Sequence, residues 1–185
     1  MAWIKSPTVK DAKGRTKKVY DNIMKDRGHV ANVFQAQGLE PDALEDHVSM
    51  YVHLMIDPGP LSREEREAIA VVVSAANRCA YGAVHHSEAL ETVEKDPKAL
   101  SKLIKEFSTK HESPRTKALL AYAAKLTLDP KDITQEDIQD LTDAGLSDTE
   151  ILRANLIASY FNFSNRIALG LGVDIEEGES RRYKY

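Results

Sequence analysis

A chain of 185 residues with a net charge of −4 is long enough for one domain with its own core, and it has no excess of basic residues. The charge argues against nucleic-acid binding, and no uncharged stretch approaches the roughly 20 residues that a bilayer-spanning helix needs. The N-terminus lacks the apolar segment of a secretory signal, and a single cysteine cannot form an internal disulfide. We therefore expect a cytoplasmic protein with no nucleic-acid or membrane partner.

The first half of the chain has helical periodicity. Apolar residues recur at helical spacing between residues 41 and 56, and Asp57–Pro60 ends the predicted helix. Ser62 and Glu65 have the spacing of a capping box, so a second helix is expected to begin there. Its apolar run, Ala68–Ala76, predicts a central position in the fold. Three adjacent valines in this run also fit a buried strand, but the capping box favours the helix.

The rest of the chain also reads as a series of helices. One is predicted from about Asn77, a good N-cap residue, to about Glu94. Further helix starts are indicated at Pro97, Pro114, Thr134 and Ser147. The last helix is expected to extend to about Leu169, where glycines follow. The prediction is a single all-α domain of about seven helices over residues 1–185, with residues 1–15 and 174–185 extended or mobile.

The residues best suited to chemistry lie around the only cysteine. If residues 78–94 form one helix, then Cys79, Gly82 and His86 share a face. Position 82 would lie one turn from His86, whereas Cys79 would lie about 10 Å away along the axis, too far for a thiol–imidazole hydrogen bond. A base at position 86 would best activate a nucleophile at position 82, and glycine cannot be one.

Cys79 itself allows two interpretations. In the first turn of a helix, unpaired backbone N–H groups would favour its thiolate, and Arg78 could add positive charge. A free cysteine is, however, more often a small buried apolar residue. His85 and His86 would point about 100° apart on a helix, so we expect only one of them to face a shared site. They also lack the spacing for joint metal binding, and no metal site is predicted.

Other polar residues are weaker candidates. Glu67 lies directly against the apolar run, and a carboxylate buried near a histidine could transfer protons, although a solvated first turn is the plainer interpretation. Asn162, Asn165 and Arg166 interrupt an otherwise apolar helix. We interpret these three as structural.

Several segments together resemble a known family. They are Leu61–Glu67, Val71–Cys79, His85–Leu90, Ser113–Arg115 and Tyr160–Ile167. They are similar to the alkyl hydroperoxidase D-like branch of the carboxymuconolactone decarboxylase family, in particular to its peroxidase-related subgroup. The resemblance implies an all-α bundle that forms a homo-oligomer and uses no cofactor.

The resemblance also implies roles for individual residues. The family pattern has a glutamate, a CxxC pair and a histidine, which Glu67, Cys79 and His86 match, with Gly82 in place of the second cysteine. In the implied mechanism the second cysteine attacks a peroxide with help from a glutamate–histidine proton relay, and the first cysteine then forms a disulfide with it. With Gly82 at the second position, this cycle cannot run within one chain.

Three hypotheses remain. In the first, Cys79 attacks the peroxide, and an external thiol reductant or another subunit's Cys79 completes the cycle. In the second, Glu67 and His86 perform acid–base chemistry on a small organic substrate, such as an organic acid, in a cofactor-free decarboxylase- or isomerase-like reaction. In the third, the protein is a non-catalytic oligomeric binding module.

Overall fold

The structure is a computed structural model and describes residues 2–91 and 113–176. This part is helical without strands, which confirms the predicted all-α class. The α-helices are α1 (Gly14–Arg27), α2 (Asn32–Gln35), α3 (Pro41–Tyr51), α4 (Arg63–Ala76), α5 (Ala80–Glu91), α7 (Pro114–Leu128), α8 (Gln135–Asp143) and α9 (Asp148–Gly170). A π-helical turn, η1 (Val52–Ile56), extends α3, and a 3-10 turn, η2 (Pro130–Asp132), follows α7.

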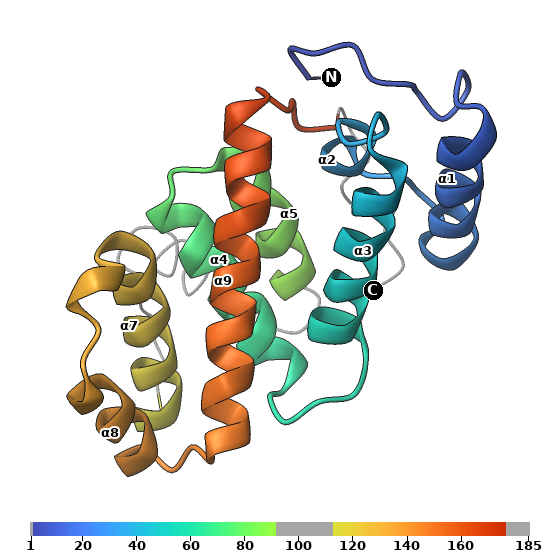
Figure 1. Cartoon of the computed structure of the whole chain (residues 1–185). Coiled ribbons are helices and arrows are strands. Elements are labelled where there is room, and N and C mark those ends of the chain that lie inside the picture. The colour runs from blue at the N-terminus through green and yellow to red at the C-terminus, as the bar shows by residue number, and fades with distance from the viewer. Residues whose placement is uncertain (1, 92–112, 177–185) are drawn as a thin grey trace.

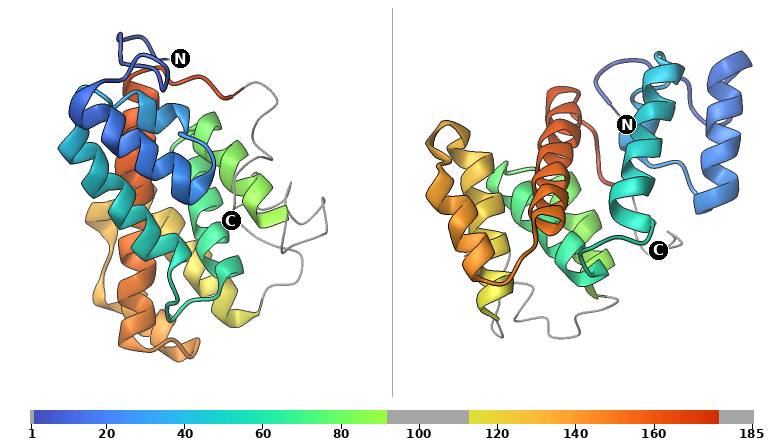
Figure 2. Two further views of the ribbon diagram at one scale, coloured as in Figure 1. Left: turned by 90° about the vertical axis from the view of Figure 1, so that its right-hand side faces the viewer. Right: turned by 60° about the horizontal axis from the view of Figure 1, so that its bottom comes forward.

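Helix α4 is central, as its apolar run predicted. It packs against α5, α7 and α9, and every residue from Arg66 to Ser74 is buried. Ser62 and Glu65 form the predicted capping box, with N–H to side-chain distances of 2.8 and 3.1 Å. The 23-residue α9 runs the length of the bundle, with α7 and α8 on one side and α3 on the other (Figure 1). Helix α1 lies outermost, beyond α3 (Figure 2).

The buried side chains form two clusters. The larger one joins α4, α7 and α9 with η1, and includes Ile69 and Ile157. The smaller one lies beneath α1, α2 and α3, and reaches Cys79 and Tyr81 at the start of α5. No helix among the described residues has both the length and the apolar character needed to cross a membrane. The candidate site described below lies where the two clusters meet.

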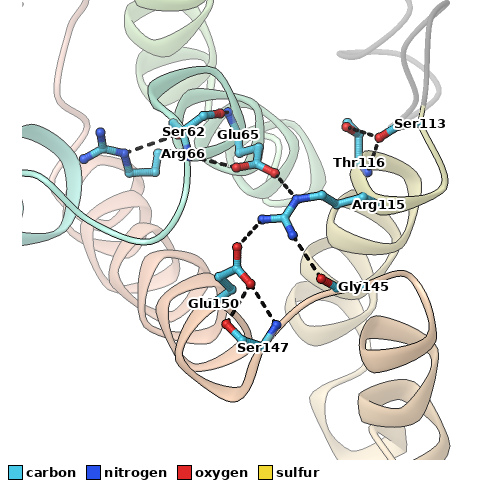
Figure 3. Close-up of polar contacts among 9 residues, drawn as sticks. All are labelled: Ser62, Glu65, Arg66, Ser113, Arg115, Thr116, Gly145, Ser147 and Glu150. Carbon is cyan, nitrogen blue, oxygen red and sulfur yellow. Dashed lines mark hydrogen bonds and ion pairs between the residues drawn. The ribbon is translucent and has the colours of Figure 1, made fainter.

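Arg115 joins the N-terminal ends of three helices (Figure 3). From the first turn of α7, its Nε donates to Glu65 of α4 at 2.7 Å, and its Nη2 donates to Glu150 of α9 at 2.7 Å. Glu150 also accepts hydrogen bonds from the backbone and hydroxyl of Ser147, which holds the pKa of this carboxyl down at about 2. These bonds fix the longitudinal position of α7 and α9 relative to α4.

The link between α4 and α5 differs from the prediction. Asn77 ends α4 instead of beginning the next helix, and its side chain donates to the carbonyl of Val73 at 3.0 Å. Arg78 has a φ of 55°, a left-handed conformation that reverses the chain, so α5 begins only at Ala80. Asparagine is common at both ends of helices, so its presence alone does not distinguish a start from a stop. The predicted helix start at Pro97 lies outside the described residues.

Parts of the expected extended termini are ordered by contacts. Helix α1 begins at Gly14, and the backbone N–H of Trp3 donates to the carbonyl of Leu171 at 2.7 Å. Near the other end, the carbonyl of Asp174 accepts a bond from Asn32, and Glu176 is buried. The segment that follows α9 therefore returns to the start of α2.

Candidate active site

Glu67 and His86 form a buried acid–base pair across α4 and α5. Oε2 of Glu67 lies 2.7 Å from Nδ1 of His86, and Oε1 lies 2.7 Å from Nη2 of Arg63, one turn earlier in α4. The Glu67 side chain is fully buried, as its position against the apolar run suggested. Arg63 balances the charge of a carboxylate that burial alone would destabilise, and His86 gives that carboxylate a hydrogen bond.

This arrangement fixes the tautomer of His86. Since a carboxylate accepts hydrogen bonds, Nδ1 of His86 carries the proton and donates a hydrogen bond to Glu67. The ring meets Phe161 edge-on, with centroids 4.4 Å apart, which holds its orientation. Nε2 is therefore left as an acceptor, and it has no hydrogen-bond partner among the residues that the structure describes. Such a nitrogen is equipped to take up a proton.

His86 borders a cavity that encloses about 580 Å³ of empty space, including solvent at its mouth. The lining residues are Arg27, Ala31, Val33, Phe34, Tyr51, Tyr81, Gly82, His85, His86, Tyr160, Phe161, Ser164 and Asn165. They include members of both buried clusters and are mainly apolar or aromatic. A lining of this kind is typical of a site for a small organic molecule.

Both adjacent histidines line this cavity, so the expectation that only one could face it is wrong. The ring of His85 packs at a tilt against Tyr81 with centroids 4.4 Å apart, while His86 packs on Phe161. The cavity extends far enough around α5 to border both side chains, even though they leave the helix in different directions.

Glu176 reaches the same wall from the end of the described chain. Its Oε2 lies 2.6 Å from Nε2 of His85, and its Oε1 accepts bonds from the hydroxyl of Tyr81 and the backbone N–H of Asn32. Burial alone would raise the pKa of Glu176, but the bonds from His85 and Asn32 outweigh it and lower the pKa to about 2. No signal in the sequence points to this contact, because 91 residues separate Glu176 from His85.

Arg27 contributes a buried positive charge to the cavity. It is the last residue of α1 and is 7% exposed. Its guanidinium carbon lies 4.5 Å from the centroid of the Tyr51 ring, and Nη2 lies 3.5 Å from the Tyr51 hydroxyl. No sequence signal distinguishes Arg27, because a basic residue in the last turn of a helix is common for reasons unrelated to a site.

A neutral histidine supports the aromatic wall. Nδ1 of His47 lies 2.9 Å from Oε1 of Gln37, and Nε2 lies 2.8 Å from the hydroxyl of Tyr160. Burial lowers the pKa of His47 to about 4, so at neutral pH the ring donates to Gln37 and accepts from Tyr160. This network fixes the Tyr160 ring at the cavity.

Cys79 lies apart from the cavity lining. It immediately precedes α5, is 1% exposed and packs within the smaller buried cluster. Burial raises the pKa of its thiol, although hydrogen bonds from the backbone N–H groups of Gly82 and Tyr81 oppose this effect. The structure thus brings together two of the three predicted site residues, Glu67 and His86. Of the three, His86 lines the cavity, Glu67 lies behind it, and Cys79 lies apart from both the cavity lining and this pair.

The space beside Gly82 is occupied. A Cβ atom at this position would lie 2.5 Å from both Oγ of Ser74 and Oδ1 of Asn165. These two buried side chains hydrogen-bond to each other, with Oγ 3.2 Å from Nδ2 of Asn165. Asn165 also lines the cavity, so a polar amide lies where the family pattern would place a second cysteine.

A family model described as PA26 p53-induced protein (sestrin) matches residues 2–184. This chain belongs to the PA26 (sestrin) family. Among the residues that the structure describes, this family member has no group of three or more His, Cys, Asp or Glu side chains arranged to hold a metal ion. No curated protein matches it significantly.

Solved structures relate this PA26-family protein to AhpD-like proteins, which confirms the resemblance seen in the sequence. An uncharacterized peroxidase-related protein from Ralstonia eutropha JMP134, with an alkylhydroperoxidase AhpD core, has 26% identity and a TM-score of 0.84, with 99% of this chain and 98% of that chain covered. A peroxidase-related protein from Silicibacter sp. TM1040 has 28% identity and a TM-score of 0.84, over 95% and 92% of the two chains. The debrominase Bmp8, at 18% identity and a TM-score of 0.77 over 95% and 93%, shares the fold.

Proposed function

We propose that this protein is an AhpD-like enzyme whose Glu67–His86 pair transfers a proton on a small organic molecule bound in the aromatic cavity. The observation that carries the proposal is the 2.7 Å bond between Glu67 and Nδ1 of His86, which leaves Nε2 as an acceptor on a residue that borders the cavity. A base held by a carboxylate in this way is a common catalytic arrangement.

The chemistry that fits is a cofactor-free isomerisation of a carbon acid. Nε2 of His86 would take a proton from one carbon of the substrate, and Glu67 would stabilise the resulting imidazolium. His86 would then return the proton to a second carbon, so the reaction needs no oxidant, reductant or further reactant. In the debrominase Bmp8, a variant was solved in complex with 2,3,4-tribromopyrrole, so the fold holds a small planar ring in that protein.

The test is proton exchange in D₂O, followed by proton NMR over a panel of aryl ketones and unsaturated acids. We expect the wild type to exchange a carbon-bound proton in at least one compound, and Glu67→Gln and His86→Gln to lose at least about 100-fold of this rate. Glu64→Gln and His53→Gln are matched controls, since both residues are exposed and neither lines the cavity. Equal rates in Glu67→Gln, His86→Gln and the controls would rule out the proposed role.

A one-cysteine peroxidase is the second candidate. Burial raises the pKa of the Cys79 thiol, and the feature that favours this candidate is the pair of backbone N–H groups, from Gly82 and Tyr81, that act in the opposite direction. Cys79 would attack a peroxide oxygen, release an alcohol or water and become a sulfenic acid, and an external thiol would reduce it again. Intact-mass measurement after peroxide treatment tests this: a chain that stays unmodified at modest peroxide excess excludes Cys79 as the nucleophile.

A further inference from the structure

We propose that Arg27 binds the carboxylate of a substrate that carries one negative charge, and that it selects aromatic monocarboxylates for this cavity. The inference rests on the proposed function in one respect, that the cavity is a substrate site. It adds the chemical class of the substrate and the residue that recognises it.

Arg27 carries a charge that no neighbouring carboxylate balances in the part of the chain that the structure describes. Within residues 2–91 and 113–176, its guanidinium has no carboxylate within 4.0 Å, and its polar contacts are with the ring face and hydroxyl of Tyr51. Burying a cation without an anion is unfavourable, and a neutral phenol compensates only in part. A ligand carboxylate in the cavity would supply the missing charge and could accept two parallel bonds from the guanidinium.

The other charges at the cavity already have partners. Glu67 is paired with Arg63 and His86, and Glu176 is bound to His85 and Tyr81. Arg27 is therefore the group that remains for an incoming anion, and it can balance one negative charge. A second carboxylate on the ligand would lie in a cavity bordered by the partners of two buried glutamates, without a cation of its own. This arrangement favours monocarboxylates over dicarboxylates.

The cavity walls indicate the rest of the ligand. Phe34, Tyr51, Tyr160 and Phe161 provide aromatic surface beside Arg27 and His86. Their rings are held edge-to-face or tilted, with centroids 5.1 to 6.4 Å apart in the pairs that link them. Such a wall packs well against a planar apolar body. A ligand with its carboxylate on Arg27 would thus expose its ring carbons or side chain to His86.

The test is isothermal titration calorimetry with three small probes. Benzoate has the proposed charge and ring, benzyl alcohol lacks the charge, and phthalate has a second carboxylate. We expect benzoate to bind the wild type at least about tenfold more tightly than either of the others, and Arg27→Gln to weaken benzoate binding at least about tenfold. Arg166→Gln is the matched control, since Arg166 is an exposed arginine of α9 outside the cavity, and it should leave binding unchanged.

A second measurement separates recognition from a merely structural role. If Arg27 serves a ligand, Arg27→Gln removes an unbalanced buried charge, and the free protein should keep or gain thermal stability while losing the stabilisation that benzoate gives. Arg27→Lys should retain part of the benzoate affinity, because it keeps the charge and loses the planar fork. Unchanged benzoate binding in Arg27→Gln, or equal binding of benzoate and benzyl alcohol to the wild type, would overturn the inference.

These binding measurements do not depend on turnover. Glu67→Gln and His86→Gln should still bind benzoate, even though proton exchange is lost. Benzoate binding without proton exchange in the wild type would remove the proposed reaction and leave the Arg27 site intact. Proton exchange confined to neutral compounds would remove the proposed carboxylate site at Arg27 and leave the proposed reaction intact.

Discussion

Oγ of Ser74 lies 2.5 Å from the place where a Cβ atom on Gly82 would be. Oδ1 of Asn165 lies at the same distance from that point, so two buried polar side chains fill the space beside the glycine. Position 82 therefore differs from the family pattern in two ways, because it lacks the thiol and also lacks the space for one. Any side chain at this position would have to displace Ser74 or Asn165.

The first prediction concerns this close packing. Gly82→Ala should reduce the free energy of unfolding by about 1–2 kcal/mol, because overpacking outweighs the gain in helix propensity from alanine. Urea unfolding followed by circular dichroism measures the change. Adding Ser74→Gly should recover part of the loss in the double variant. A stabilised Gly82→Ala would show that the space is open.

A related prediction is that Gly82→Cys does not create a two-cysteine peroxidase. The new side chain must displace Ser74 and Asn165. In addition, burial raises the pKa of the Cys79 thiol. Peroxide consumption with dithiothreitol as reductant should stay at the level of Gly82→Ala, the matched control. Peroxidase activity in Gly82→Cys alone would contradict this prediction.

Cys79 should react slowly in the folded protein. Its burial and raised pKa both lower the amount of accessible thiolate near neutral pH. We expect iodoacetamide labelling, followed by mass spectrometry, to be slow in buffer and to become fast above the urea midpoint. Rapid labelling of the native protein would instead support the peroxidase candidate.

The low pKa of His47 should make the protein less stable in mild acid. Its pKa is about 4 in the folded protein and about 6.5 in an unfolded chain, so the unfolded state binds more protons between these values. Stability should therefore fall as the pH drops from about 6.5 to 4, by on the order of 3 kcal/mol from this group. His47→Gln should remove this part of the pH dependence, whereas His53→Gln, at an exposed position, should retain it. Urea unfolding at pH 7 and pH 4.5 provides the comparison.

Glu176 contributes a pH dependence of the same sign in a more acidic range. Its pKa is lowered to about 2 in the folded protein, so the stability that its ionised form provides is present above about 4.5 and is lost as the pH falls toward 2. Glu176→Gln should cost about 1–3 kcal/mol at pH 7, because His85 and Asn32 lose a charged acceptor. The difference from wild type, measured by urea unfolding, should shrink below pH 4.5. Glu91→Gln, at an exposed position, should show no such trend.

Local sequence signals predicted most of the fold. The capping boxes at Ser62 and Ser147, and the proline after Ser113, place the starts of α4, α9 and α7 correctly, because each signal acts within a single turn. The start of α5 was misplaced at Asn77, since a left-handed Arg78 leaves no comparable mark in the sequence.

The site was predicted only where a family pattern covered it. Glu67 and His86 lie on adjacent helices, and the pattern places both. Arg27 lines the cavity, and Glu176 contacts the lining residues His85 and Tyr81. Tertiary packing brings both there from distant parts of the chain, and periodicity and spacing do not encode it. Tyr160 fits the apolar face of the last helix and Asn165 is interpreted from the sequence as structural, although both line the cavity.

The outer position of α1 has a consequence for how the cavity is filled. This helix packs chiefly against α3, so residues 14–27 can open locally at less cost than the central helices. Opening would withdraw Arg27 and create an entrance, and an anion bound to Arg27 would hold the helix closed again. Ligand occupancy should then appear as slower hydrogen exchange in α1, with the exchange of α4 unchanged.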